Sequence, residues 1–224
     1  MKKIAIIVAG GTGTRMKGKT PKQFIEVNGK PVIIYSFEAF FYYDNSIRFI
    51  LALHPGHFSI WKKIINKYPI FAGLTVVSGG ETRFHSVLNA LKMVEEESLV
   101  AIHDAVRPMV SRETISRCFK TAKANGCAVP CLEISESVRE ITSAGTRPVE
   151  RDKLRTIQTP QVFRSDILKK AYEQKYRMSF TDDATVVENA GYKITLVEGN
   201  RENIKITTKE DLILIETRLS KKFK

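Results

Sequence analysis

The residues best suited to chemistry lie near the start of the chain, where the turn Gly10-Gly11-Thr12-Gly13 follows the apolar run from Ile4 to Ala9. Glycines let the backbone adopt positive φ and approach a ligand closely, because they carry no Cβ atom. Unpaired N–H groups in such a turn form a concavity that binds anions. The cations that follow are Arg15, Lys17, Lys19 and Lys22. A glycine turn followed by clustered positive charge predicts a site for a polyphosphate.

Two phosphate-binding motifs compete for this stretch. The dinucleotide pattern G-x-G-x-x-G is incomplete, because Met16 stands where its third glycine would be. The P-loop pattern G-x-x-x-x-G-K-[ST] is matched in full by residues 13–20. However, Pro21 follows Thr20 and disfavours the helical conformation that a P-loop needs at that residue. A P-loop NTPase is therefore an alternative that the local sequence disfavours.

Further polar clusters follow other apolar runs of the chain. They cover residues 79–86, 103–107 and 203–205. In open parallel sheets, ligands bind in the crevice at the carboxyl ends of the strands. We therefore expect these clusters to converge with the glycine turn on one crevice.

The composition favours a folded α/β protein that binds anions. The chain has 224 residues, which predicts a single domain over residues 1–224. Its net charge of +12 favours anionic ligands such as nucleotides and sugar phosphates. A basic nucleic-acid-binding module is a distant alternative, but no RNA- or DNA-binding motif accompanies the charge. We therefore expect no nucleic-acid partner.

The cysteines and the apolar runs indicate where the protein works. Cys118, Cys127 and Cys131 form no C-x-x-C pair, so we expect reduced thiols rather than a disulfide framework or a zinc site. No stretch approaches the roughly 18 consecutive apolar residues that a membrane-spanning helix needs. These features predict a cytoplasmic protein without a membrane partner.

Segments with strand and helix patterns alternate along the chain, which predicts βαβ units and a largely parallel sheet. Expected strands cover residues 4–9, 47–53, 74–77, 99–102, 127–132, 192–197 and 203–206. Expected helices begin near Pro31, His57, Thr82, Ser111, Ser165, Thr181 and Thr207. The strands would place the polar clusters, and the helices would cover the sheet.

The pattern changes over residues 133–152. Residues 137–141 and 147–150 alternate with polar side chains on both faces and flank a Ser143-Ala144-Gly145 turn, so we expect a β-hairpin. A hairpin without an apolar face has no reason to pack on the main sheet. We therefore expect this segment to project as a β-arm subdomain and to contact a partner chain.

Several motifs together resemble the 2-C-methyl-D-erythritol 4-phosphate cytidylyltransferase family, within the sugar-phosphate nucleotidyltransferases. The matching pieces are AGGTGTRM, PKQF, GGETRFHSV, HDAVRP, QTPQVF, TDDATVVE and EGNRENIKIT, and they cover nearly the whole chain. Each piece is weak alone, but their shared order is specific. The resemblance implies a three-layer α/β/α Rossmann-like nucleotidyltransferase fold with a mostly parallel sheet and a projecting β-hairpin arm.

The resemblance also assigns roles to residues around the nucleotide. It implies that the CTP site is formed by Ala9, Gly10, Gly11, Gly13, Thr14, Gly80, Glu81, Ser86, Asp104 and Ala105. Arg15 and Lys22 would grip the α-phosphate and neutralise charge in the transition state. Asp104 would also bind the metal, an Mg²⁺ ion. Together with Arg151 and Lys205, Arg15 and Lys22 would form the catalytic set.

A second group would hold the acceptor, a sugar-alcohol phosphate. The resemblance implies that this group comprises Asp104, Arg107, Ser137, Arg151, Thr159 and Lys205. Ser137 stands where the family usually has threonine. In the family the arm is exchanged within a homodimer, so Arg151 would serve the neighbouring subunit's site.

The implied reaction transfers CMP from CTP to 2-C-methyl-D-erythritol 4-phosphate and releases pyrophosphate, in the non-mevalonate route to isoprenoid precursors. The attacking phosphate oxygen is already an anion, so catalysis reduces to positioning and charge neutralisation. The nearest alternative is ribitol 5-phosphate cytidylyltransferase, which shares nearly the same CTP site. Acceptor choice therefore depends on few contacts.

Overall fold

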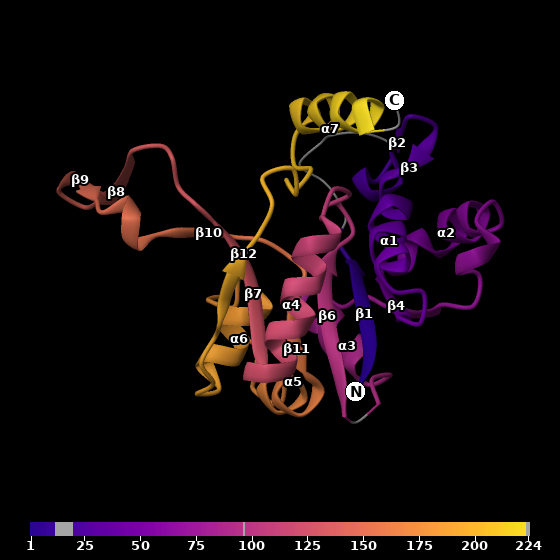
Figure 1. Ribbon diagram of the computed structural model, residues 1–224, viewed down its shortest axis with the longest axis horizontal. Helices are drawn as coiled ribbons and strands as arrows, with labels where there is room; N and C mark the ends of the chain where they lie inside the picture. Colours follow the sequence, from indigo (N-terminus) through magenta and orange to yellow (C-terminus); the bar gives the residue numbers. More distant parts are fainter. Residues whose placement is uncertain (12–19, 96, 223–224) are drawn as a thin grey trace.

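The computed structural model describes residues 1–11, 20–95 and 97–222, and its centre is a mixed β-sheet (Figure 1). The strand order is β10-β7-β11-β6-β1-β4-β5, and β12 also pairs with β7. The strands are β1 (Lys2–Ala9), β4 (Arg48–Leu53), β5 (Thr75–Ser78), β6 (Ser98–Asp104), β7 (Cys127–Glu133), β10 (Arg155–Ile157), β11 (Gln161–Arg164) and β12 (Leu196–Glu198). The pairings of β1 with β4 and β6, β4 with β5, and β12 with β7 are parallel. Only β10 and β11 pair antiparallel with their neighbours in this sheet of the described chain.

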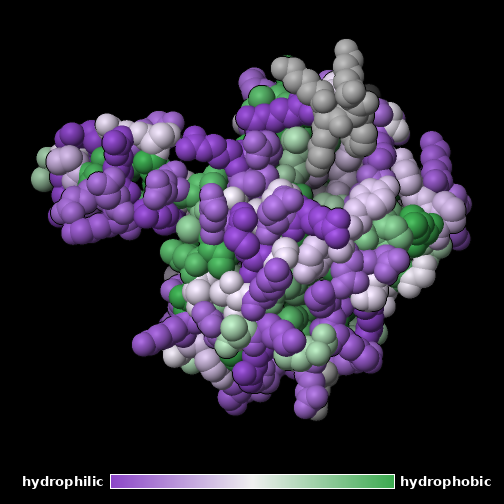
Figure 2. Space-filling model, viewed as in Figure 1, coloured by the Kyte–Doolittle hydropathy of each residue, from purple (hydrophilic) through white to green (hydrophobic). Residues whose placement is uncertain are grey.

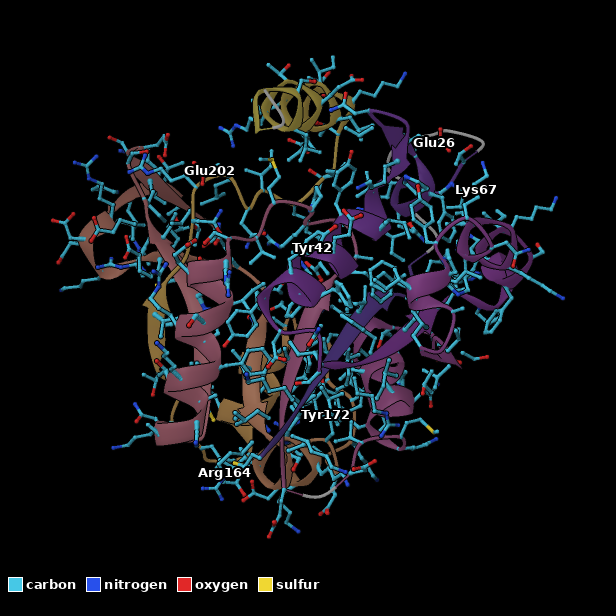
Figure 3. The ribbon with its side chains drawn as sticks, turned by 45° about the vertical axis from the view of Figure 1, so that its right-hand side comes forward. Glu26, Tyr42, Lys67, Arg164, Tyr172 and Glu202 are labelled. Atoms are coloured by element: carbon cyan, nitrogen blue, oxygen red, sulfur yellow. The ribbon has the colours of Figure 1, made fainter. Side chains whose placement is uncertain are left out.

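Helices cover both faces of the sheet. They are α1 (Val32–Tyr43), α2 (Phe58–Ile65), α3 (Arg83–Leu91), α4 (Arg112–Asn125), α5 (Ser165–Ala171), α6 (Asp183–Asn189) and α7 (Lys209–Lys222). Side chains alternate between the faces of a strand. On β1, Ile7 belongs to the core that includes Phe37 of α1, whereas Ile6 belongs to the core that includes Val87 of α3. Two buried cores on one sheet give the three-layer α/β/α architecture, and Figure 3 shows side chains filling both sides of it.

A smaller third core lies near the carboxyl end of β1, beneath α7 at the top of Figure 1. There Ile215 and Leu219 of α7 belong to one cluster with Val27, Val106 and Ile206. Val27 comes from the short pair β2 (Glu26–Val27) and β3 (Lys30–Pro31). This core fixes the segment after Lys22 beside the segment that carries Lys205.

The expected hairpin is confirmed as a pair of strands, β8 (Val138–Thr142) and β9 (Gly145–Val149). Their antiparallel register pairs Val138 with Val149 and Thr142 with Gly145. The hairpin stands away from the main body (Figure 1), and its surface is mostly hydrophilic (Figure 2). Ile141 is 87% exposed, so the hairpin has almost no apolar contact of its own there.

The structure corrects several sequence-based expectations. The strand expected at residues 203–206 is wrong: the segment is outside the sheet, although the Ile206 N–H donates to the Val106 carbonyl. Ser165 does not cap α5, because its hydroxyl accepts from the Ser98 N–H instead. Residues 161–164, which begin within the QTPQVF segment, form β11, whereas we expected no strand before the helix near Ser165.

Two helix starts also differ from the sequence-based expectation. Asp182, not Thr181, caps α6, and its carboxylate accepts the Thr185 N–H at 2.9 Å. At α7 the Thr208 hydroxyl accepts from the Asp211 N–H, one residue later than the expected Thr207 cap. No helix in the described ranges is long and apolar enough to cross a membrane.

Candidate active site

A cavity of about 320 Å³ opens at the carboxyl ends of β1 and β6. One wall is the glycine segment after β1, and another is the turn that begins α3. The residues that line it are Val8, Ala9, Gly10, Gly11, Lys22, Gln23, Gly80, Glu81, Thr82, Arg83, Ser86, Asp104, Ala105, Val106 and Lys205. Residues from positions 8 to 205 therefore converge on one crevice, as the strand-end clusters predicted.

Glycine is required on the cavity wall because two backbone segments approach each other closely. A Cβ atom built on Gly10 would lie 2.3 Å from Ser86 Oγ, and one on Gly79 would lie 2.9 Å from the Gly10 Cα. Ser86 Oγ accepts from the Gly80 N–H at 3.0 Å and donates to the Thr82 carbonyl at 3.0 Å. Ser86 thereby fixes the Gly79-Gly80 segment against the first turn of α3, and Gly10 packs directly on Ser86.

Lys22 and the residues after it connect the start of the chain to its end. Lys22 begins the short helix η2 (Lys22–Phe24), and its ammonium donates to the Ile206 carbonyl at 3.0 Å. The Gln23 amide donates to the Ala9 carbonyl at 3.5 Å. The Lys22 ammonium is therefore placed beside the segment that carries Lys205.

Asp104 is the centre of charge in the cavity. Its carboxylate lies 2.9 Å from Lys205 Nζ, 3.3 Å from Arg107 Nε and 3.5 Å from Arg83 Nε. Burial alone would raise its pKa, but Arg83, Lys205 and Arg107 hold the pKa well below its usual range. Asp104 is therefore ionised at every physiological pH.

The backbone of Asp104 is held from behind by a buried pair, Thr159 and His103. Thr159 Oγ1 accepts from the Asp104 N–H at 3.1 Å and lies 3.0 Å from His103 Nδ1. His103 Nε2 lies 3.0 Å from the Arg107 carbonyl. Burial lowers the pKa of His103 to about 4, so the imidazole is neutral and structural rather than a general base.

Arg83 is a cavity residue that sequence reasoning did not identify. It is the first residue of α3, after the Thr82 cap, and its guanidinium joins Asp104 to the buried Asp183. Its Nη2 lies 2.6 Å from Asp183 Oδ2. The sequence did contain a signal for it. Arg83 stands between Gly79-Gly80 and the apolar positions of α3, and this spacing places it at a helix N-terminus that faces the same crevice.

Not all residues expected at the site line this cavity. Gly13, Thr14 and Arg15 lie outside the described residues. Thr159 is buried behind Asp104 instead of lining the cavity. Arg107 borders the cavity through its contact with Asp104 and donates from Nη1 to the Asn203 carbonyl at 2.8 Å.

The arm residues lie apart from the cavity within one chain. Arg151 starts the short helix η5 (Arg151–Lys153), where its guanidinium donates to the Ser135 carbonyl. It lines a separate hollow of about 380 Å³ with Arg155 and Arg201. Ser137 is exposed just before β8. Within a single chain, the arm therefore supplies none of the residues that line the cavity.

A crevice at the carboxyl ends of a mostly parallel sheet, with glycine backbone on one wall and cations around a carboxylate, is the architecture of a Rossmann-like nucleotidyltransferase. A family model described as 2-C-methyl-D-erythritol 4-phosphate cytidylyltransferase matches residues 3–221. The chain belongs to this family. Membership also argues against the P-loop NTPase and the nucleic-acid-binding module.

Individual relatives agree with the family model. The chain is 47% identical over 216 residues to the 2-C-methyl-D-erythritol 4-phosphate cytidylyltransferase of Phocaeicola vulgatus, covering 96% of this chain and 99% of the relative. It is 43% identical over 220 residues to that of Porphyromonas gingivalis, covering 98% of each chain. The crystal structure of the cytidylyltransferase from Thermus thermophilus superposes with a TM-score of 0.78 at 30% identity, covering 98% of this chain and 100% of the other.

Proposed function

We propose that the protein transfers CMP from CTP to 2-C-methyl-D-erythritol 4-phosphate and releases pyrophosphate. The observation that carries the proposal is the convergence of Lys22, Lys205 and Asp104 on the glycine-walled cavity. Such a site needs cations on two sides, because two anionic phosphates must be brought together. Full-length relatives that carry this enzyme name support the choice of substrates.

The proposed reaction is an in-line attack of the acceptor's phosphate oxygen on the α-phosphorus of CTP. Lys22, and Arg15 from the adjacent segment, would neutralise the charge that develops on the α-phosphate. Lys205 and Arg107, which contact Asp104, would orient the attacking phosphate. No general base is required because the nucleophile is already ionised. Positioning and charge neutralisation then account for the rate enhancement.

The donor set of the cavity fits an Mg²⁺ cofactor. Mg²⁺ is usually held by one or two carboxylates together with substrate phosphate oxygens, rather than by a full protein cage. Asp104 and Glu81 are the carboxylates among the described residues that line the cavity. Asp104 would hold the ion, which would supply charge neutralisation on the triphosphate. The described residues contain no cluster of three or more His, Cys, Asp or Glu for a metal, which agrees with a site completed by the nucleotide.

We also propose a homodimer in which residues 133–152 form an exchanged arm on an otherwise single domain. The arm projects from the body (Figure 1), and Arg151 does not line its own chain's cavity. An arm from a second copy would bring Arg151 and Ser137 to the acceptor phosphate. Thr159 would act through the Asp104 backbone that its hydroxyl contacts.

We also propose a cytoplasmic location, which the cysteine side chains support. All three cysteines are free. Burial raises the pKa of Cys118 to about 12 and that of Cys127 to about 11, so both are unreactive core thiols. Such thiols suit a reducing compartment. Recovery of the native protein mainly in a membrane or secreted fraction would contradict this assignment.

A pyrophosphate-release assay tests the proposed function directly. Purified protein and Mg²⁺ are combined with each nucleoside triphosphate, and the acceptor is methylerythritol phosphate, ribitol 5-phosphate or none. We expect release with CTP and methylerythritol phosphate only. Faster release with ribitol 5-phosphate would transfer the assignment to that acceptor, and release without an acceptor would contradict a transferase. Omission of Mg²⁺ should abolish release.

A further inference from the structure

Asp183 is a carboxylate buried completely behind the cavity, at the first residue of α6. A buried charge is costly unless it is paired and hydrogen-bonded. Asp183 has both kinds of partner: Oδ2 lies 2.6 Å from Arg83 Nη2, and Oδ1 accepts from the Tyr172 hydroxyl at 2.6 Å. Asp183 itself does not line the cavity. Its chemical influence on the site therefore passes through Arg83.

Arg83 has one edge on Asp183 and another toward the nucleotide cavity. The guanidinium is a planar fork with five N–H donors, so fixing one edge fixes the direction of the others. Its Nε faces Asp104 at 3.5 Å, a longer contact than the 2.6 Å contact to Asp183. The guanidinium is therefore held more closely by Asp183 than by Asp104. Loss of the Asp183 charge would let Arg83 move toward Asp104, the carboxylate proposed to hold Mg²⁺.

The neighbours of Asp183 make this geometry rigid. Tyr172 of α5 stacks on Phe84, the residue after Arg83, with 4.7 Å between the ring centroids and 17° between the planes. On the other side, the Gln161 amide donates to Asp182 at 2.8 Å, and Gln161 Oε1 accepts from the Ala184 N–H. Tyr172, labelled in Figure 3, therefore holds both the carboxylate and the start of α3.

We propose that Asp183, oriented by Tyr172, is a positioning residue that aims the Arg83 guanidinium at bound CTP and keeps it from moving closer to Asp104 than the present 3.5 Å contact. The inference rests on the proposed function and extends it to residues outside the cavity. Arg83 would contact the nucleotide, whereas Asp183 would act only through Arg83. The expected defect is in CTP use and not in use of the acceptor.

The test is a double-mutant cycle with Asp183→Asn and Arg83→Ala, measured by steady-state kinetics and by calorimetric binding of CTP with Mg²⁺. Asp183→Asn keeps the volume and an acceptor for Tyr172 but removes the charge. We expect kcat/KM for CTP to fall by roughly 10- to 100-fold, the scale for losing a group that orients a residue at the active site. The KM for methylerythritol phosphate should stay within about twofold, because Asp183 acts only through Arg83.

Non-additivity is the decisive readout. In the Arg83→Ala background, Asp183→Asn should change kcat/KM and CTP affinity little, because the residue through which it acts is absent. Additive losses, or a loss that merely follows a lower melting temperature, would overturn the inference. Asp182→Asn is the matched control: Asp182 caps the same helix but has no described contact with Arg83, so CTP affinity should hold even if stability falls.

Tyr172→Phe is the second variant if Asp183→Asn does not fold. It retains the ring stacking and the Asp183 charge but removes the hydroxyl that orients the carboxylate. We expect a smaller loss in CTP affinity that also disappears in the Arg83→Ala background. A wild-type protein that neither binds CTP nor turns over would refute the proposed function. A wild-type protein that does both, with an additive cycle, would refute only this inference.

Discussion

At the scale of single residues, the site is organised by one carboxylate among cations. Asp104 contacts Lys205, Arg107 and Arg83, and its side chain is only 8% exposed. Close cations repel one another, and a carboxylate between them offsets that repulsion. Asp104 therefore allows Lys205 and Arg107 to approach the position proposed for the acceptor phosphate.

Lys22 is the described cation whose removal tests the proposed chemistry most directly. If its ammonium neutralises the α-phosphate, Lys22→Ala should lower kcat by about a hundredfold, the scale for losing one oxyanion-type donor. Arg15→Ala should have a similar effect. Steady-state pyrophosphate release measures both, with Lys120→Ala as a control for lost positive charge, because Lys120 is an exposed residue of α4. Near-normal turnover in the Lys22 variant would refute its role.

At the scale of elements, the junction between the glycine turn and α3 determines the shape of the cavity. A Cβ at Gly10 would lie 2.3 Å from Ser86 Oγ, so Gly10→Ala forces the turn and α3 apart. We expect a loss of about 1–3 kcal/mol in the free energy of unfolding, the cost of overpacking. Ser86→Ala in the same chain removes the closest atom and should restore part of the stability. Urea unfolding of the two single variants and the double variant measures this, and an unchanged Gly10→Ala protein would contradict it.

The start of β1 and the end of α1 are joined by an ion pair that should respond to acid. Asp44 follows α1 and accepts from Lys3 Nζ at 2.7 Å and from Ser46. The hydrogen bond from Lys3, with those from Ser46, lowers the pKa of Asp44 to about 2. Because this folded-state pKa is depressed, the stabilisation is present above pH ~4 and is lost as the pH falls toward 2.

This pH dependence can be isolated by comparison with Asp44→Asn. Wild type should exceed the variant in free energy of unfolding by about 1–2 kcal/mol at pH 7, since one pKa unit corresponds to about 1.4 kcal/mol. The difference should shrink as the pH falls below 4. Denaturant titrations at several pH values measure it, with Asp152→Asn as the matched control because Asp152 is almost fully exposed. A difference that stays constant with pH would exclude the ion pair as its source.

The elements that sequence could predict are those with a strong local signal. The strand at residues 4–9 and the helix start at Ser111 were confirmed, because a continuous apolar run and a capping side chain are local features of the sequence. β11 was not predictable by the same means. It pairs with β6 and β7, which are distant in sequence, and its extended form depends on those partners.

Part of the cavity could also be predicted from local signals in the sequence. Glycines and the HDA segment follow strands, so the rule that parallel strands end at one edge brought Gly10 and Asp104 together. The position of Arg83 at the start of α3 was a local signal, but its pairing with Asp183, a hundred residues later in the chain, was not. Pairing across such a distance leaves no local pattern. The location of Arg151 likewise depends on the projecting arm, which places it in a separate hollow and not in the cavity of its own chain.

At the scale of the whole molecule, the projecting arm leads to a prediction about subunit exchange. If Arg151 serves the partner's cavity, each active site combines Lys22 of one chain with Arg151 of the other. Lys22→Ala and Arg151→Ala homodimers should both be nearly inactive. A heterodimer of the two variants would then contain one site with both residues intact and one site with neither.

Equal mixing of the two variants, followed by denaturation and refolding, should therefore restore about a quarter of the wild-type activity, since half of random dimers are mixed and each has one intact site. Pyrophosphate release before and after mixing measures the recovery. Mixing each variant with a further sample of itself is the control and should restore nothing. If Arg151 instead served its own chain, every site would carry one defect and mixing would recover no activity. That result, with a dimer verified by light scattering, would exclude the exchanged arm.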